Sequence, residues 1–402
     1  MLPTPSVLPV LAALTVTVGV GPADAALAAA RAAARAPADL PDLAVPANGC
    51  VGASPTVAAE PSWAFQRLAP PVVWTLTRGD SVVVAVLDTG VSATAPALAG
   101  AVRPGVDVVR GGRADLDCRG RGTALAGLVA ARPQRGSAMV GIAPGATILP
   151  VRIVDEQGRV PDGALAAGLR AATQAGAKVI LVGTGTTHPD AALRAAVREA
   201  VAADVVVVAP VAGEASDRST KAGDVWYPAA FPEVIAVGGS GPDGTVSGSP
   251  PAEAGVDVAA PSEGVVSIGP VGRGHFRVGG TAVAAAQVAA VTALVRGYRR
   301  DDHVGAVTDR IVRTAEPPVD PALARFVGAG MVDVREAVAA TVVGTAVLDP
   351  LPADAETPPA APPRSPAASI AVGASAIGLA AAALAAAILA TIRSGRRRGW
   401  QR

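Results

Sequence analysis

Apolar residues gather in short blocks along the chain, and the clearest block lies at 82–87. Every residue from Val82 to Leu87 is apolar, and glycines flank the block at Gly79 and Gly90. A short apolar run bounded by turn residues is typical of a strand buried on both faces, as in a parallel sheet covered by helices. We therefore expect an α/β domain organised around this strand.

Further strands and helices alternate after this run. The pattern predicts strands at 148–154, 179–182, 205–210, 234–237 and 256–259, and helices at 123–131, 165–175, 191–202, 282–298, 310–315 and 332–340. Alternation at these lengths specifies a doubly wound parallel sheet with helices on both faces.

Three segments carry candidate chemistry. Asp88 follows the apolar run directly, where functional groups collect beyond the carboxyl ends of parallel strands. An isolated acid there is more often the cap of a turn or a helix than a catalytic group. Two further segments are candidates for functional residues, at 117–127 and 278–286. Each is a glycine-flanked loop that leads into a helix of small residues.

Together these segments resemble the three signature blocks of the subtilisin-like serine proteases (peptidase S8), in the order aspartate, histidine, serine. The family reads His-Gly-Thr and Gly-Thr-Ser in the second and third blocks. This chain instead has Arg121 at the histidine position and Ala282 at the serine position.

The resemblance is greatest to the mycosins, the membrane-anchored subtilases of type VII secretion systems. Besides the triad blocks, the matching stretches are 63–70, 73–79, 141–146, 227–232, 256–261 and 330–334, which span roughly residues 50–340. The resemblance implies a subtilase-like domain at 63–340.

This resemblance also implies degenerate catalysis. Arg121 keeps its proton at any ordinary pH and cannot act as a general base, and Ala282 cannot form an acyl-enzyme. Glu214 stands where subtilases place the asparagine that donates to the oxyanion, and a carboxylate accepts rather than donates. We expect Arg121 to pair with Asp88 and to reach toward Glu214.

Other residues are not expected to restore peptide hydrolysis. The three histidines, His188, His275 and His303, are expected to be surface or turn residues rather than general bases, with His275 in a strand or turn that leads into the helix at 282–298. A metal-dependent or two-carboxylate hydrolase using Asp88 and Glu214 is an alternative, but a fixed cation between them would compete with a metal. No His/Cys ligand spacing is present, so no metal or cofactor is expected.

The amino-acid composition indicates how the core is built and which partners are not expected. Half of the 402 residues are hydrophobic but only 2% are aromatic, so the core must be built from Val, Ala and Leu. Five of the 34 basic residues follow residue 392; the other 29, against 33 acidic residues, give a net charge of −4. Without a basic run or interleaved aromatics, we expect no nucleic-acid partner.

The N-terminus resembles a secretory signal at 1–25, with an apolar run from Val7 to Val20 and cleavage before Ala26, although a charged n-region is missing. A membrane-anchored N-terminus is the alternative.

An Ala/Pro-rich extension follows at 26–62. Cys50 and Cys118 are the only cysteines, and in an exported chain two cysteines favour one disulfide. The mycosin resemblance implies that this bridge ties down the extension.

The C-terminus predicts a membrane anchor. A Pro-rich linker at 341–368 precedes a segment at 369–392, whose uncharged residues 370–392 can cross a hydrocarbon core of about 30 Å. By the positive-inside rule, we expect the basic tail at 393–402 in the cytoplasm and the large domain outside the membrane. A buried soluble helix is the alternative.

Two functions follow from these observations. One is a pseudoprotease that serves as a scaffold or peptide-binding component of a type VII secretion system, with membrane components or a peptide in the former cleft as partners. The other is an unconventional or weakly active S8-family endopeptidase of the cell envelope.

Overall fold

The structure is a computed structural model, and it describes residues 40–46, 49–213, 224–247 and 255–341. The predicted signal peptide, most of the linker, the predicted span, the basic tail and Glu214 lie outside the described residues. Contacts between Cα atoms divide the chain into units 1–342 and 343–402, of which only the first contains described residues.

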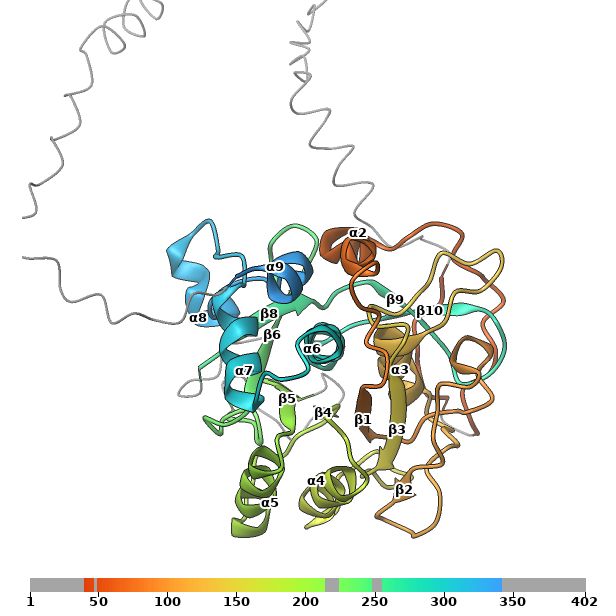
Figure 1. The fold of residues 1–402 in the computed structure, drawn as a ribbon. Helices are drawn as coiled ribbons and strands as arrows, with labels where there is room; N and C mark the ends of the chain where they lie inside the picture. The colour runs from red at the N-terminus through yellow and green to blue at the C-terminus, as the bar shows by residue number, and fades with distance from the viewer. Residues whose placement is uncertain (1–39, 47–48, 214–223, 248–254, 342–402) are drawn as a thin grey trace, which may run out of the picture. The chain divides into compact units, whose positions relative to one another are not determined.

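A parallel sheet forms the centre of the domain (Figure 1). Its strands run in the order β2-β3-β1-β4-β5-β6-β7, and β8 also pairs with β6; all these pairs are parallel except β6 with β7. Their bounds are β1 (Val83–Asp88), β2 (Val106–Asp107), β3 (Thr147–Arg152), β4 (Val179–Val182), β5 (Val206–Pro210), β6 (Ile235–Ser240), β7 (Val246–Ser247) and β8 (Val258–Pro261). This confirms the predicted fold class.

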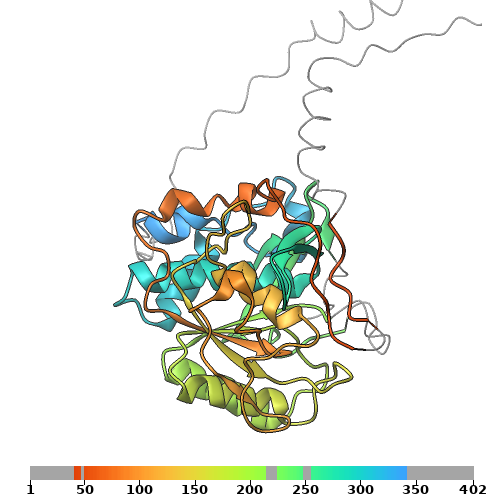
Figure 2. The same cartoon turned by 90° about the vertical axis from the view of Figure 1, so that its right-hand side faces the viewer.

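Helices cover both faces of the sheet (Figures 1 and 2). On one face lie α4 (Ala164–Gln174) and α5 (Ala191–Ala202), and on the other lie α3 (Arg121–Ala130), α6 (Thr281–Tyr298), α7 (Val304–Arg313) and α9 (Val334–Ala339). The smaller helical elements are α2 (Trp63–Leu68), α8 (Ala324–Val327) and the 3-10 turns η1 (Pro70–Val73), η2 (Pro96–Leu98) and η3 (Pro321–Leu323).

Strand β1 shows why its sequence is apolar at every position. Val84 and Val86 pack in the cluster that contains α3 and α6, whereas Val83, Ala85 and Leu87 pack in the cluster under α4 and α5. Successive side chains of a strand point to opposite faces, and here both faces are buried. Burial of each of these valines and of the leucine contributes about 1.5–3 kcal/mol relative to exposure.

Helix α6 is the central helix of the larger cluster. It is rich in alanine and buried on nearly all sides, as expected of a helix that is apolar all round. Among the described residues it is also the one helix long and apolar enough to cross a membrane, but 83% of that apolar window is buried inside the fold. We therefore assign its hydropathy to the core, and it gives little support to a membrane span.

Several element boundaries differ from the prediction. The predicted helix at 310–315 is the end of α7, which begins earlier because the His303 side chain accepts a hydrogen bond from the Ala306 amide and caps it. The antiparallel hairpin of β9 (Val265–Ile268) and β10 (His275–Val278) was not predicted. Its edge strand also pairs with the N-terminal extension, through a bridge between Asp42 and Arg277.

Candidate functional site

Asp88 ends β1 at the carboxyl edge of the sheet and is fully buried. Its Oδ1 atom accepts hydrogen bonds from the Thr89 amide at 2.7 Å and from Arg121 Nε at 2.9 Å. Its Oδ2 atom finds no hydrogen-bond partner among the described residues, and a Cβ added at Gly183 would lie 2.0 Å from it. Gly183 thus leaves the room that the carboxylate occupies.

Arg121 is the first residue of α3, and its side chain is 18% exposed. The preceding residue, Gly120, has φ +78°, a conformation that glycine adopts without strain. The Gly122 amide donates to Thr89 Oγ1 at 2.9 Å, which joins the first turn of α3 to the end of β1. This geometry presents Arg121 to Asp88, and the predicted ion pair is present.

Asp117 fixes the same helix end from the other side. Its carboxylate accepts from the Gly120 amide at 2.9 Å and from the amide and hydroxyl of Thr123 at 2.8 and 2.7 Å. Burial raises the pKa of Asp117, while the bonds from Thr123, Thr89 and Gly120 oppose that rise. This role of Asp117 was not predicted from the sequence, although an acid a few residues before a helix start is a capping signal.

Ala282 is the second residue of α6, and it is half-buried. The hydroxyl of the neighbouring Thr281 donates to the Ala212 carbonyl at 2.9 Å, so its proton faces a carbonyl oxygen rather than a general base. Helix α3 packs directly against α6. The structure therefore brings Asp88 and Arg121 into contact and places Ala282 on the helix that packs beside them, while Glu214 lies outside the described residues.

The histidines have other partners. His188 is exposed and lies 3.0 Å from Thr187 Oγ1, and His303 is the exposed cap of α7. His275 lies in a strand before α6, one of the two positions expected for it, but its burial contradicts the expectation of a surface residue. It lies in β10, is 3% exposed and has a pKa lowered by burial. Within the described ranges, no group of three or more His, Cys, Asp or Glu side chains could hold a metal ion.

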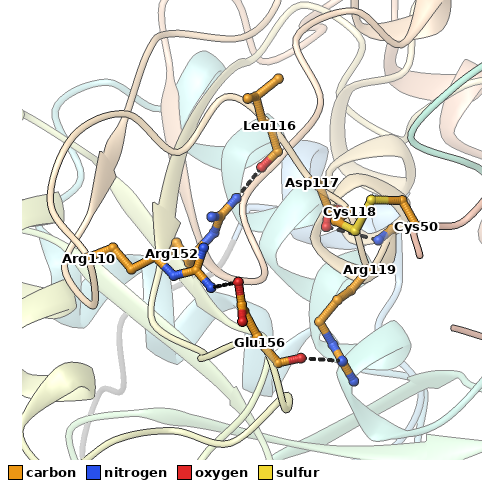
Figure 3. The surroundings of a disulfide bond; sticks show 9 residues. Cys50, Arg110, Leu116, Asp117, Cys118, Arg119, Arg152 and Glu156 are labelled. Carbon is orange, nitrogen blue, oxygen red and sulfur yellow. Dashed lines mark hydrogen bonds and ion pairs between the residues drawn. A yellow bond between two sulfur atoms is a disulfide. The ribbon is translucent and has the colours of Figure 1, made fainter. Parts of the chain in front are cut away.

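The disulfide Cys50–Cys118 is present, as predicted, and joins residues 68 positions apart (Figure 3). Beside it the Val51 amide donates to the Cys118 carbonyl at 2.9 Å. Arg119 donates to the Glu156 carbonyl at 3.0 Å, and the Glu156 side chain pairs with Arg110. The loop that leads into Arg121 is thus attached both to the extension and to the loop after β3.

A parallel α/β sheet with an aspartate at the end of its central strand, and with two glycine-capped helices beside that aspartate, has the architecture of the subtilisin-like hydrolases. The Subtilase family (Peptidase_S8) matches residues 79–330 of the chain. The chain belongs to this family.

Relatives by sequence include proteases. Thermitase of Thermoactinomyces vulgaris is 34% identical over 235 residues, which cover 58% of this chain and 82% of thermitase. The intracellular serine protease of Paenibacillus polymyxa is 31% identical over 235 residues, which cover 58% of this chain and 71% of that protease.

Similar solved structures include mycosins. MycP1, described as a serine protease and an essential component of the type VII (ESX-1) secretion system, is 28% identical with a TM-score of 0.61 over 76% of this chain and 97% of its own. MycP3 protease from the type VII (ESX-3) system is 26% identical with a TM-score of 0.58 over 74% of this chain and 96% of its own.

Proposed function

We propose that this chain is a mycosin-like pseudoprotease, a subtilase fold that has lost peptide hydrolysis and serves as a scaffold or peptide-binding component of a type VII secretion system. The observation that carries the proposal is the Arg121–Asp88 ion pair, with 2.9 Å between Nε and Oδ1. In the family motif the residue at position 121 is the histidine that takes the proton of the nucleophile.

An arginine cannot do the work of that histidine. A general base needs a free lone pair and a pKa near the working pH, whereas guanidinium stays protonated. Moreover, Arg121 engages the same carboxylate that would orient the histidine. Asp88 then acts as the counter-ion of a fixed cation rather than as part of a proton relay.

The other two substitutions act in the same direction. Ala282 has no oxygen with which to attack a peptide carbonyl. Loss of an oxyanion donor alone costs about 3–4 kcal/mol of transition-state stabilisation in subtilases, and Glu214 would place a negative charge where that donor belongs. Restoring one residue therefore leaves at least two defects.

A membrane-anchored role in secretion rests on the sequence and on the mycosin neighbours. The uncharged residues 370–392 and the arginines after them support a single span with an extracytoplasmic domain. MycP1 and MycP3 belong to type VII secretion systems, and we propose the same setting for this chain.

The test is labelling of the purified chain with a serine-directed fluorophosphonate probe, with thermitase as the positive control. We expect no labelling and no peptide cleavage. Ala282→Ser alone should also remain without turnover, because Arg121 and Glu214 persist. A matched variant that combines Ala282→Ser, Arg121→His and Glu214→Asn tests whether the rest of the cleft remains competent. Labelling or cleavage by the wild-type chain would instead support an unconventional protease and overturn the proposal.

A further inference from the structure

His275 joins the N-terminal extension to the core through its imidazole ring. Nδ1 accepts a hydrogen bond from the Ala58 amide at 2.8 Å, and Nε2 lies 3.3 Å from Ser137 Oγ. Because Nδ1 accepts, the neutral ring carries its proton on Nε2 and donates to Ser137. Both ring nitrogens are therefore used only when the imidazole is neutral.

The main chain of the N-terminal extension also contacts β10 and the turn before it. The His275 amide donates to the Thr56 carbonyl at 2.7 Å, and a Cβ added at Gly274 would lie 1.9 Å from the Ser54 carbonyl oxygen. Further along, the Arg277 amide donates to the Pro41 carbonyl at 2.8 Å. We call residues 51–62, between Cys50 and α2, the strap; it contacts the turn 272–274 and the first residue of β10, His275.

We propose that the strap is a pH-sensitive latch, closed by neutral His275 and released when the imidazole gains a proton. A protonated ring has N–H donors on both nitrogens. At 2.8 Å the new Nδ1–H would point at the Ala58 N–H, so an attractive contact would become a repulsive one.

The surroundings of the ring offer the cation no compensation. The cavity beside it is lined by η2, by Gln134, by Ile268 and Gly269 at the end of β9, and by the turn 272–274, and its one other ionisable residue is Arg273. His275 pairs with Ile268 in the hairpin, and the strap contacts the ring through the Ala58 amide and the His275 amide through the Thr56 carbonyl. Arg273 adds positive charge, and its side chain donates to the Arg135 carbonyl.

The direction of the effect follows from proton linkage. Burial lowers the pKa of His275 below its ordinary value of about 6.5, so the open strap binds the proton more readily than the closed one. The closed state is fully favoured above about pH 6.5 and loses stability as the pH falls, until the pKa of the closed form is reached. Between pH 7.5 and 5.5 the open fraction should rise by up to about tenfold.

Hydrogen exchange on the full chain tests the latch. We expect protection of the Ala58 amide, corrected for intrinsic exchange rates, to fall by up to about tenfold between pH 7.5 and 5.5, while α4 and α5 keep theirs. In His275→Asn, whose amide oxygen can accept from Ala58 but does not titrate, strap protection should not change with pH. His303→Asn is the matched control, because His303 also accepts through Nδ1 but caps α7, and its strap should respond as the wild type does.

Two results would overturn the latch. One is strap protection in the wild type that does not change over this pH range, and the other is an unchanged pH response in His275→Asn. If His275→Asn opens the strap at every pH, an NMR titration of the His275 ring in the wild type replaces this variant as the test. Ring protonation that coincides with loss of Ala58 protection supports the latch. Ring protonation without that loss rejects it. The outcome is independent of whether the chain hydrolyses peptides.

Discussion

The Arg121–Asp88 pair combines a fully buried carboxylate with a guanidinium that is 18% exposed. Removal of one partner from such a pair leaves a buried charge without compensation, which costs far more than the pair contributes when it is intact. The cost of losing Arg121 therefore reports on the burial of Asp88 rather than on catalysis.

Arg121→Ala should lower the free energy of unfolding by about 3–5 kcal/mol. Arg170→Ala is the matched control, because Arg170 pairs with Glu199 at 2.8 Å on the surface, and such pairs contribute below about 1 kcal/mol. Urea denaturation of the three proteins measures both effects. Addition of Asp88→Asn to Arg121→Ala should recover part of the loss, and equal costs for the two arginines would contradict the burial argument.

The sequence predicts best the elements whose structure is determined by neighbouring residues in the chain. Strand β4 and helix α5 were predicted with their observed ends, because an apolar run between turn residues and the N-cap Asp190 are local signals. The β9–β10 hairpin and the burial of His275 were not predicted. His275 is covered by the strap, which contacts it from more than 200 positions earlier in the chain, and no local signal reports such a contact.

The candidate site divides in the same way. Motif order located Asp88, Arg121 and Ala282, and charge predicted the ion pair. The capping role of Asp117 and the room left by Gly183 depend on the exact approach of α3 and of the loop after β4 to the end of β1. Such approaches are set by packing, which a single sequence does not specify.

At the level of elements, the disulfide joins the extension to the loop that begins α3. In the chain-entropy account, closing a loop of 68 residues stabilises the fold by about 4 kcal/mol. The double variant Cys50→Ala with Cys118→Ala should lose about this much in urea denaturation. It should also show faster hydrogen exchange in the strap and at residues 115–123 than in α5. An unchanged midpoint, or loss of protection spread evenly over the domain, would contradict this assignment.

At the level of the whole molecule, the domain is expected to lie outside the membrane. A disulfide is typical of proteins exposed to an oxidising compartment, and the described domain contains one. The arginines from Arg393 to Arg402 favour a cytoplasmic tail. These two observations are independent of each other, and both give the same orientation.

Protease added outside intact spheroplasts should therefore digest residues 40–341 and spare an epitope tag placed after Arg402. Lysis of the spheroplasts before digestion should expose the tag, which controls for a tag that resists cleavage. A variant with the arginines at 393, 396, 397 and 398 changed to glutamine should weaken this orientation, because the bias depends on positive charge near the end of the span. A protected domain in intact spheroplasts would contradict the orientation, and recovery of the chain in the soluble fraction after lysis would contradict the anchor itself.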